Sequence, residues 1–244
     1  MEDAVRPTLL GNIVIRVINL NTTRRYALNI KGIPYKTEWV EFPDIEALAK
    51  KIGAAPTIRS DGTPGYSVPI ISDSNTGKVI SDSFVIAEYL DATYPNGKIL
   101  FPPGTKPLFA AFESGVLNGM KEIAMPQLAA SYNIMNPSSQ EHFRRTRETK
   151  YGQKVEEFSP VGPKRDADVA KGKVGFDAID GWLSKSEGKF VLGDTVSYAD
   201  GILAAWLIWI KITNEIWKDV ATWHNGRWAT YLENMEKAGY ASVD

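Results

Sequence analysis

A valine–proline pair lies within an expected strand of the 244-residue chain. Val68-Pro69 is followed by two isoleucines, and residues 66–71 have strand-forming composition. Proline has no amide hydrogen to give to a sheet ladder, so it belongs at the edge or the start of a strand. Two interpretations stay open. The proline is trans and starts the strand, or it is cis and turns the Val68 backbone outward to bond a peptide-like ligand.

A short polar turn precedes a segment of apolar helix formers. Ser81-Asp82-Ser83 stands directly before residues 84–90. Ser and Asp side chains commonly accept hydrogen bonds from the unpaired amides at a helix N-terminus. The same amides, together with the helix dipole, also attract a carboxylate. The turn therefore indicates either a simple N-cap or an anion-binding site.

A third polar pattern precedes the most apolar helix of the chain. Ser197 and Asp200 form an S-x-x-D capping pattern, in which Asp replaces the usual Glu at the third helical position. A capping pair of this kind satisfies backbone groups and performs no chemistry. We expect it to be structural.

Composition excludes several classes of function. The 28 Lys and Arg residues are balanced by 29 Asp and Glu residues, so the basic excess of a nucleic-acid-binding protein is missing. The densest basic stretch, residues 142–147, has acidic neighbours and is expected to be a solvated helix face. With no cysteine, the chain has no disulfide, no thiolate zinc site and no cysteine nucleophile. The two histidines lie far apart, so no metal site is expected.

The sequence also predicts a soluble, cytoplasmic protein. The first residues lack the basic and apolar regions of a secretory signal. The longest uncharged apolar run, residues 201–210, is too short to cross a bilayer. The absence of cysteine fits a reducing compartment.

Two domains are expected from the order of the elements. Residues 1–100 alternate strands and helices, and residues 108–244 have helical periodicity after a Pro- and Gly-rich linker at 94–107. Pro126 is expected to kink or end the first helix of the second domain. In the first domain the expected strands are 12–18, 35–42, 66–71 and 78–80, and the expected helices are 24–31, 45–52 and 81–90. Further helices are expected around 138–157, 164–186, 197–217 and 226–237.

Taken in order, these motifs resemble those of the glutathione transferase superfamily over nearly the whole chain. SVPI, SDSFVIAEYLD and VLGDTVSYAD are similar to that family's cis-proline strand, γ-glutamyl-binding turn and C-domain capping box. The stretch RRYALNIKGIPYKTEWVEFPDIEALAKKIGAAPT resembles the fungal-specific transferases related to bacterial lignin β-etherases. The resemblance implies an α/β thioredoxin-like N-terminal domain followed by an all-α C-terminal helical bundle.

The resemblance also implies glutathione as the ligand and the reacting thiol. Asp82 and Ser83 would hold its γ-glutamyl end, and Val68, fixed by Pro69, would bond the cysteinyl backbone. The residue types agree, because a carboxylate accepts from an ammonium, while a hydroxyl and a helix amide donate to a carboxylate.

The thiolate-stabilising region departs from the family pattern. The family places Ser, Tyr or Cys near the end of the first strand or the start of the first helix, where this chain has Ile18 or Asn19. A protein must stabilise the sulfur anion, since only the thiolate attacks and a free thiol has a pKa of about 8.5. The candidate catalytic donors are Asn19, Asn21, Thr22 and Thr23. These side chains could equally be N-caps of the helix that follows.

The leading functional hypothesis is a detoxifying transferase that conjugates glutathione to small hydrophobic or aromatic electrophiles, aryl ethers included. The alternative is a non-catalytic, ligandin-type binder of aromatic molecules that uses glutathione as a ligand, and a protein-interaction module has less support. Aromatic residues that could line a second pocket, although most are expected in the core, are Trp39, Phe112, Tyr132, Tyr151, Phe158, Trp206, Trp209 and Trp217. We also expect a homodimer with Leu108 to Met120 in its interface.

Overall fold

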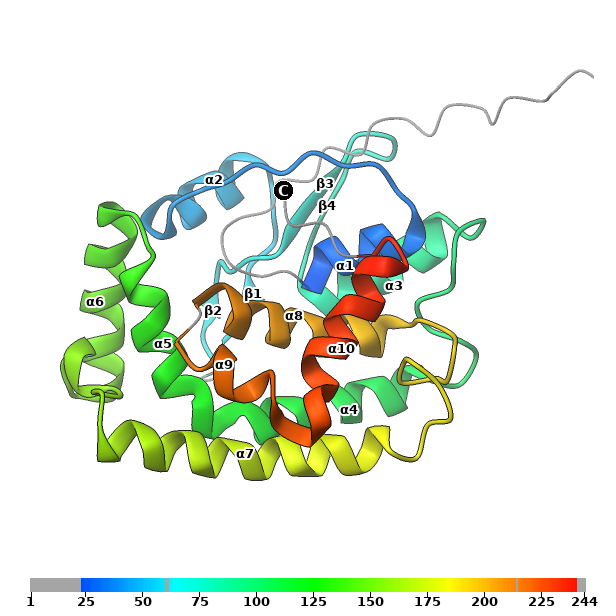
Figure 1. Ribbon diagram of the computed structural model, residues 1–244. Coiled ribbons are helices and arrows are strands. Elements are labelled where there is room, and N and C mark those ends of the chain that lie inside the picture. The colour runs from blue at the N-terminus through cyan, green and yellow to red at the C-terminus, as the bar shows by residue number, and fades with distance from the viewer. Residues whose placement is uncertain (1–22, 60–61, 214, 241–244) are drawn as a thin grey trace, which may run out of the picture.

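The structure, a computed structural model, describes residues 23–59, 62–213 and 215–240. These ranges form an N-terminal half of helices and β-hairpins and a C-terminal half whose regular elements are helices (Figure 1). The predicted strand at 12–18 lies outside the described residues.

The N-terminal half contains two short antiparallel hairpins and three helices. The hairpins pair β1 with β2 and β3 with β4. The predicted helices at 24–31 and 45–52 are confirmed, and each is followed by a glycine with positive φ, Gly32 at 68° and Gly53 at 77°. In chain order the elements are α1 (Thr23–Lys31), η1 (Phe42–Asp44), α2 (Ile45–Lys51), β1 (Thr57–Ile58), β2 (Pro64–Gly65), β3 (Ile70–Asp73), β4 (Lys78–Ser81) and α3 (Ser83–Thr93).

The strand predicted at 35–42 is wrong for the described residues. Only Tyr35 forms a β-bridge, and the chain then continues to η1 without a strand. The end of this segment is held by the helical half instead. Asn136 Nδ2 donates to Glu41 at 2.6 Å, and the Phe42 amide donates to Ser139 Oγ at 3.0 Å. These long-range bonds attach the end of the segment to α6 instead of to a neighbouring strand.

The C-terminal half is built around nine helical segments in the described part of the chain. Pro126 is the third residue of its helix, where an amide has no intrahelical partner, and the preceding helix ends at Met120, so the predicted break is confirmed. The segments are α4 (Lys106–Met120), η2 (Lys121–Ile123), α5 (Ala124–Asn133), α6 (Pro137–Tyr151), η3 (Val155–Glu157), α7 (Pro163–Leu183), α8 (Tyr198–Thr213), α9 (Trp217–Val220) and α10 (Trp223–Lys237).

The other predicted helices are present with changed ends. The helix expected to reach residue 157 stops at Tyr151, because Gly152 takes a left-handed conformation with φ 66°. The helix expected to reach 217 ends at Thr213, and a separate helix, α9, begins at Trp217. Within α10, residues 224–226 have positive φ, so its regular part begins close to the predicted start at 226.

The central helix α8 connects the two halves. It lies in the middle of the molecule, with α1, α4 and α10 packed against it (Figure 1). The linker is fixed as well, since the Asp91 carboxylate accepts from the Phe101 amide at 2.8 Å and from Lys31 Nζ at 2.9 Å. The Tyr198 amide donates to Leu100 O at 2.9 Å. These contacts hold the start of α8 against the end of α3.

Within the described ranges, no helix combines the length and apolar character needed to cross a bilayer.

Candidate glutathione-binding site

The Val68–Pro69 peptide bond is cis. Of the two interpretations of this proline, the cis form is therefore the observed one. The strand that follows, β3, begins at Ile70, four residues later than predicted. In the part of the chain that the structure describes, no hydrogen bond involves the Val68 backbone. Its polar groups are thus available to a ligand.

Asp82 caps the N-terminus of α3. Its Oδ1 accepts from the amides of Phe84 at 2.9 Å and Val85 at 3.1 Å. The residue has φ 78° and ψ 133°, a region that residues other than glycine rarely occupy and that costs about 1–3 kcal/mol. The predicted N-cap is confirmed. One oxygen, Oδ2, is left outside the cap.

Ser83 provides the donors that the cap does not use. Within the described residues, neither its hydroxyl nor its amide has a hydrogen-bond partner. The side chain is partly exposed at the first turn of α3. A hydroxyl and a helix amide on one residue form a suitable pair for a carboxylate.

One hydrogen bond joins the proline turn to the α3 cap. The Asp82 amide donates to Pro69 O at 3.2 Å. The cis-proline turn and the α3 cap, which the β3–β4 hairpin separates in sequence, are therefore neighbours in space. The unbonded Val68 backbone belongs to the turn, and the unbonded Ser83 donors belong to the cap. The structure brings together four of the eight predicted site residues: Val68, Pro69, Asp82 and Ser83.

The predicted thiolate donors are not placed. Asn19, Asn21 and Thr22 lie outside the described residues, and Thr23 begins α1 with a side chain that is also outside the description. The neighbouring Arg25 is buried, and its Nε donates to Tyr35 Oη at 3.3 Å.

Sequence reasoning missed an acidic residue near this site. Glu113, on α4, interacts electrostatically with Asp82, and burial followed by Asp82 raises the pKa of its carboxyl. Its isolation could have signalled a role, because it is the one acidic residue between Lys106 and Met120.

The Ser197–Asp200 pair forms the half of the predicted capping box in which the acidic side chain accepts from the N-cap amide, while the Asp200 amide donates to the Ser197 carbonyl oxygen. Asp200 Oδ2 accepts from the Ser197 amide at 2.7 Å and its hydroxyl at 2.9 Å, while Oδ1 accepts from Val191 N at 2.8 Å and Tyr231 Oη at 2.5 Å. The carboxylate is fully buried, and burial raises its pKa. All four bonds join elements of the helical half, which makes the role structural.

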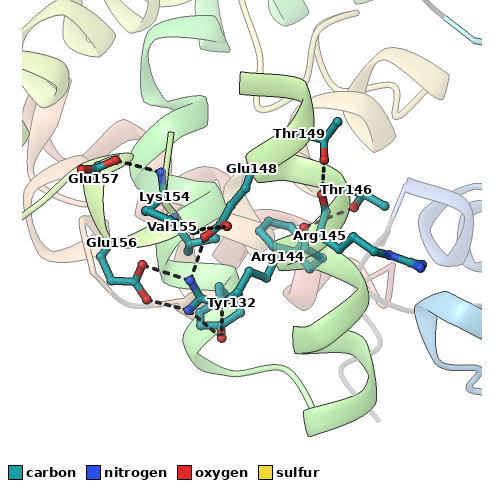
Figure 2. Close-up of polar contacts among 11 residues, drawn as sticks. Tyr132, Arg144, Arg145, Thr146, Glu148, Thr149, Lys154, Val155, Glu156 and Glu157 are labelled. Atoms are coloured by element: carbon teal, nitrogen blue, oxygen red, sulfur yellow. Dashed lines mark hydrogen bonds and ion pairs between the residues drawn. The ribbon is translucent and has the colours of Figure 1, made fainter. Parts of the chain in front are cut away.

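The helix face predicted to be solvated, residues 142–147, carries an ion-pair network at Arg144, whose side chain is 34% exposed. Figure 2 shows its guanidinium bonded to Glu148 of α6, Glu156 of η3 and Tyr132 of α5. The hydrogen bond from Arg144 is the main cause that lowers the pKa of Glu156 to about 2. This network ties α6 to α5 and η3.

The predicted pocket aromatics do not gather in one place. Trp206 and Trp209 contact each other with ring centroids 5.1 Å apart, and Tyr151 contacts the fully buried Phe158 at 5.5 Å. Phe112 instead meets Trp182, and Trp39 is 59% exposed. Among the described residues, Trp206 and Trp209 are the tryptophans of the predicted set whose rings contact each other.

A cavity of about 600 Å³ lies between the first half of α7 and residues 215–223. It is lined by apolar residues such as Ile216 and Trp223 and by charged residues, of which Arg165 and Glu215 form an ion pair at 2.5 Å. None of the predicted site residues lines it. Among the described residues there is also no cluster of His, Cys, Asp or Glu that could hold a metal ion.

Comparisons with known proteins match both halves of the chain. The family model for "Glutathione S-transferase, N-terminal domain" matches residues 24–93, and that for "Glutathione S-transferase, C-terminal domain" matches residues 107–239. A glutathione S-transferase-like protein, ustS of Aspergillus flavus, is 29% identical over 88% of this chain and 83% of its own.

Solved structures agree over the full architecture. The glutathione S-transferase CsGST63524 of Ceriporiopsis subvermispora, crystallised with glutathione, is 42% identical with a TM-score of 0.87, covering 96% of this chain and 98% of its own. The glutathione transferase GSTFuA3 of Phanerochaete chrysosporium is 36% identical with a TM-score of 0.85, covering 97% and 100%. The predicted fold class, a thioredoxin-like domain followed by a helical domain, is confirmed. The sequence matches and the shared architecture establish that the chain belongs to the glutathione S-transferase family.

Proposed function

We propose that this chain is a transferase that binds glutathione between the cis Val68–Pro69 bond and the N-terminus of α3. The Ser83 hydroxyl and amide donate to the γ-glutamyl carboxylate, and Asp82 accepts from the ammonium through the oxygen not used in the cap. The Val68 backbone bonds the cysteinyl residue. The observation that carries this proposal is the hydrogen bond from the Asp82 amide to the Pro69 carbonyl oxygen. This bond places the cis-proline turn next to the N-terminus of α3, so that the two motifs can contact the same ligand. The glutathione complex of the Ceriporiopsis subvermispora relative supports the ligand.

The reacting nucleophile is the sulfur of glutathione itself. The chain has no cysteine, so an active-site Cys mechanism is excluded. Asn19, Asn21, Thr22 and Thr23 precede or begin α1, and the positive end of that helix lowers a thiol pKa even without a hydroxyl. We assign these residues a shared role in which no single donor is essential.

The second substrate is a small hydrophobic or aromatic electrophile, aryl ethers among them. In displacement of an aryl ether, the thiolate forms a carbon–sulfur bond while the aryl oxide leaves with its bonding electrons, and the thiol proton passes to solvent. The resemblance of residues 24–57 to transferases related to lignin β-etherases supports this class. The adjacent Trp206 and Trp209 rings are the candidate apolar wall.

A homodimer is part of the proposal. Leu108 and Leu117 on α4 are 66% and 49% exposed, and Val174 and Trp182 on the adjoining α7 are 66% and 42% exposed. Large apolar side chains exposed on two packed helices favour association with another protein surface, although Leu108 and Leu117, nine residues apart, lie on opposite sides of α4. A second copy of the chain is the partner we assign to these residues.

Turnover with three electrophiles tests the enzyme proposal: a chloronitrobenzene, phenethyl isothiocyanate and a fluorescent β-aryl ether. We expect glutathione-dependent product with at least one of them. Alanine variants of Asn21, Thr22 and Thr23 should each keep measurable turnover, since removal of one dedicated donor typically costs about 100-fold or more. A loss of that size in one variant, with glutathione affinity intact, would show that this residue alone activates the sulfur.

The second candidate function is storage of aromatic molecules in a glutathione-dependent manner. It is favoured by the lack of Ser, Tyr or Cys at the position that the family uses for the sulfur. Retained binding of glutathione and of a fluorescent aromatic ligand, without turnover of any electrophile, would replace the enzyme proposal with this one.

A further inference from the structure

The cavity between α7 and residues 215–223 follows one side of the long helix α7. Arg165, Val169 and Lys173 line it at successive turns of that helix, so this wall is about 12 Å long. The rest of the lining comes from α9 and its flanks, among them Ile216, Asp219 and Trp223. A volume of about 600 Å³ is typical of a site for one small organic molecule. The cavity shares no residue with the proposed glutathione site.

The uncharged part of the lining offers an apolar surface and an aromatic ring. Val169 and the buried Ile216 provide aliphatic contacts. The Trp223 ring meets the buried Phe176 ring edge to face, with centroids 5.2 Å apart, and this contact holds the indole at the wall of the cavity. An indole contributes a large contact area and attracts cations to its π face. The cavity therefore suits an aromatic or apolar ligand body.

Two of the cations in the lining already have carboxylate partners. Arg165 pairs with Glu215 at 2.5 Å, and its Nε and second terminal nitrogen donate to Ser159 O at 3.0 and 2.7 Å. Lys173 Nζ pairs with Asp177 Oδ1 at 2.7 Å. These two side chains therefore give a ligand little unpaired positive charge.

Two carboxylates in the lining are unpaired. Asp166 and Asp219 line the cavity, and neither side chain makes a hydrogen bond or ion pair with any residue that the structure describes. Within the same ranges, Lys218 is the remaining lining cation. Asp166 also lies in the first turn of α7, where its charge complements the helix dipole and opposes the binding of an anion. The unpaired charge of the lining thus favours a cationic ligand.

We propose that this cavity is a second ligand site, which binds an organic cation with an aromatic or apolar body and a protonated amine. The body contacts Val169, Ile216 and Trp223, and the ammonium is paired with the carboxylates of Asp166 and Asp219. Because the site is separate from the proposed glutathione site, the cation and glutathione bind to one molecule at the same time. A neutral or anionic molecule of the same shape binds more weakly.

Three indole probes that differ mainly in charge provide the test. They are tryptamine, which is protonated at neutral pH, the alcohol tryptophol, and indolepropanoate. Calorimetric titration of the wild-type protein should give a Kd for tryptamine about 10-fold or more below that for tryptophol, with indolepropanoate weakest, since a charged partner strengthens a hydrogen bond. Saturating glutathione should leave the Kd for tryptamine unchanged to within about twofold.

Variants of the two carboxylates locate the cation. Asp166→Asn combined with Asp219→Asn keeps the shape of both side chains and should remove the preference for tryptamine over tryptophol. Asp194→Asn, which removes a charge from an exposed residue outside the cavity, should keep that preference.

Four results would overturn the proposal. They are no measurable binding of tryptamine, equal or tighter binding of indolepropanoate, a combined variant that keeps the wild-type preference to within twofold, and competition between tryptamine and glutathione. The last result would place the probe in the proposed glutathione site instead of this cavity.

Discussion

At the scale of single residues, Glu113 should cost the ligand-free protein stability. Its folded-state pKa lies above the ordinary 4.5, through burial and the Asp82 charge. The folded state therefore binds the proton more tightly than the unfolded state, and stability falls as the pH rises from about 4.5 to the folded-state pKa. Above that pKa the whole penalty is present.

Glu113→Gln should accordingly melt at a higher temperature than wild type at pH 8, with the difference shrinking toward pH 4.5. Thermal melting without glutathione, with Glu122→Gln as a control that changes an exposed glutamate in η2, measures this. A Glu113→Gln variant that melts below wild type at pH 8 would show that the carboxylate stabilises the fold.

Asp200 should stabilise the folded protein, unlike Glu113, because its buried carboxylate oxygens accept hydrogen bonds from backbone amides and a tyrosine hydroxyl. Asp200→Ala leaves the Ser197 and Val191 amides and the Tyr231 hydroxyl without their acceptor, at about 1–3 kcal/mol for each buried group. We expect the free energy of unfolding in urea to fall by about 3 kcal/mol or more. The exposed neighbour Asp194, changed to Ala, should shift it by less than about 0.5 kcal/mol.

Turnover per folded molecule should stay near wild type in Asp200→Ala. A selective loss of turnover with unchanged unfolding would contradict the structural assignment of the capping box.

At the scale of elements, α4 and α7 cross at two glycines. A Cβ added to Gly175 of α7 would lie 1.8 Å from the carbonyl oxygen of Gly119 in α4, whereas one added to Gly181 of α7 meets nothing within 4 Å. The added Cβ would meet backbone atoms, so no side chain can change its rotamer to relieve the clash. Gly175→Ala must therefore separate the helices, while Gly181→Ala only gains helix propensity.

We expect Gly175→Ala to lower the free energy of unfolding by about 1–3 kcal/mol or more, and Gly181→Ala to raise it by about 0.5–1 kcal/mol. Urea unfolding of the two variants gives the comparison. Equal effects of the two alanines would show that the crossing is looser than the structure indicates.

The elements that could be predicted from sequence are those whose signals are local. Gly32 and Gly53 each mark a predicted helix end by a positive φ, and the Ser197–Asp200 spacing carries its own capping geometry. Gly152 carries the same signal, but the predicted helix continued past it to residue 157. The hairpin of β1 and β2 was missed although Asp61-Gly62 is a turn signal, because each strand is only two residues long.

Contacts between distant residues could not be predicted from local pattern. The residues around Glu41 alternate as in a strand, yet the Glu41 carboxylate accepts a hydrogen bond from Asn136, which lies 95 residues away in the sequence. Arg144 has the composition of a solvated face, and its partner Glu156 lies beyond a helix end. At the candidate site, the capping role of Asp82 followed from its sequence neighbours, whereas its electrostatic interaction with Glu113 joins two helices that are distant in sequence.

At the scale of the whole molecule, the exposed apolar residues of α4 and α7 predict association. Light scattering at micromolar concentration should give about twice the chain mass of 27.0 kDa. Leu108→Glu places a charge among these residues and should give the single-chain mass, whereas Val161→Glu, at a position 83% exposed and outside them, should not. A wild-type mass near one chain, or dissociation by both variants alike, would contradict the assignment.

The central claim is that glutathione is held at the N-terminus of α3, and two serines on either side of Asp82 test it most directly. Ser83 has donors without partners in the described structure, while the Ser81 hydroxyl already donates to Ala55 O at 3.1 Å. Calorimetric titration of glutathione into Ser83→Ala should give an affinity about 10-fold or more below wild type, with an unchanged circular dichroism spectrum. Ser81→Ala should bind as wild type does. Equal affinity of Ser83→Ala and wild type would contradict the account.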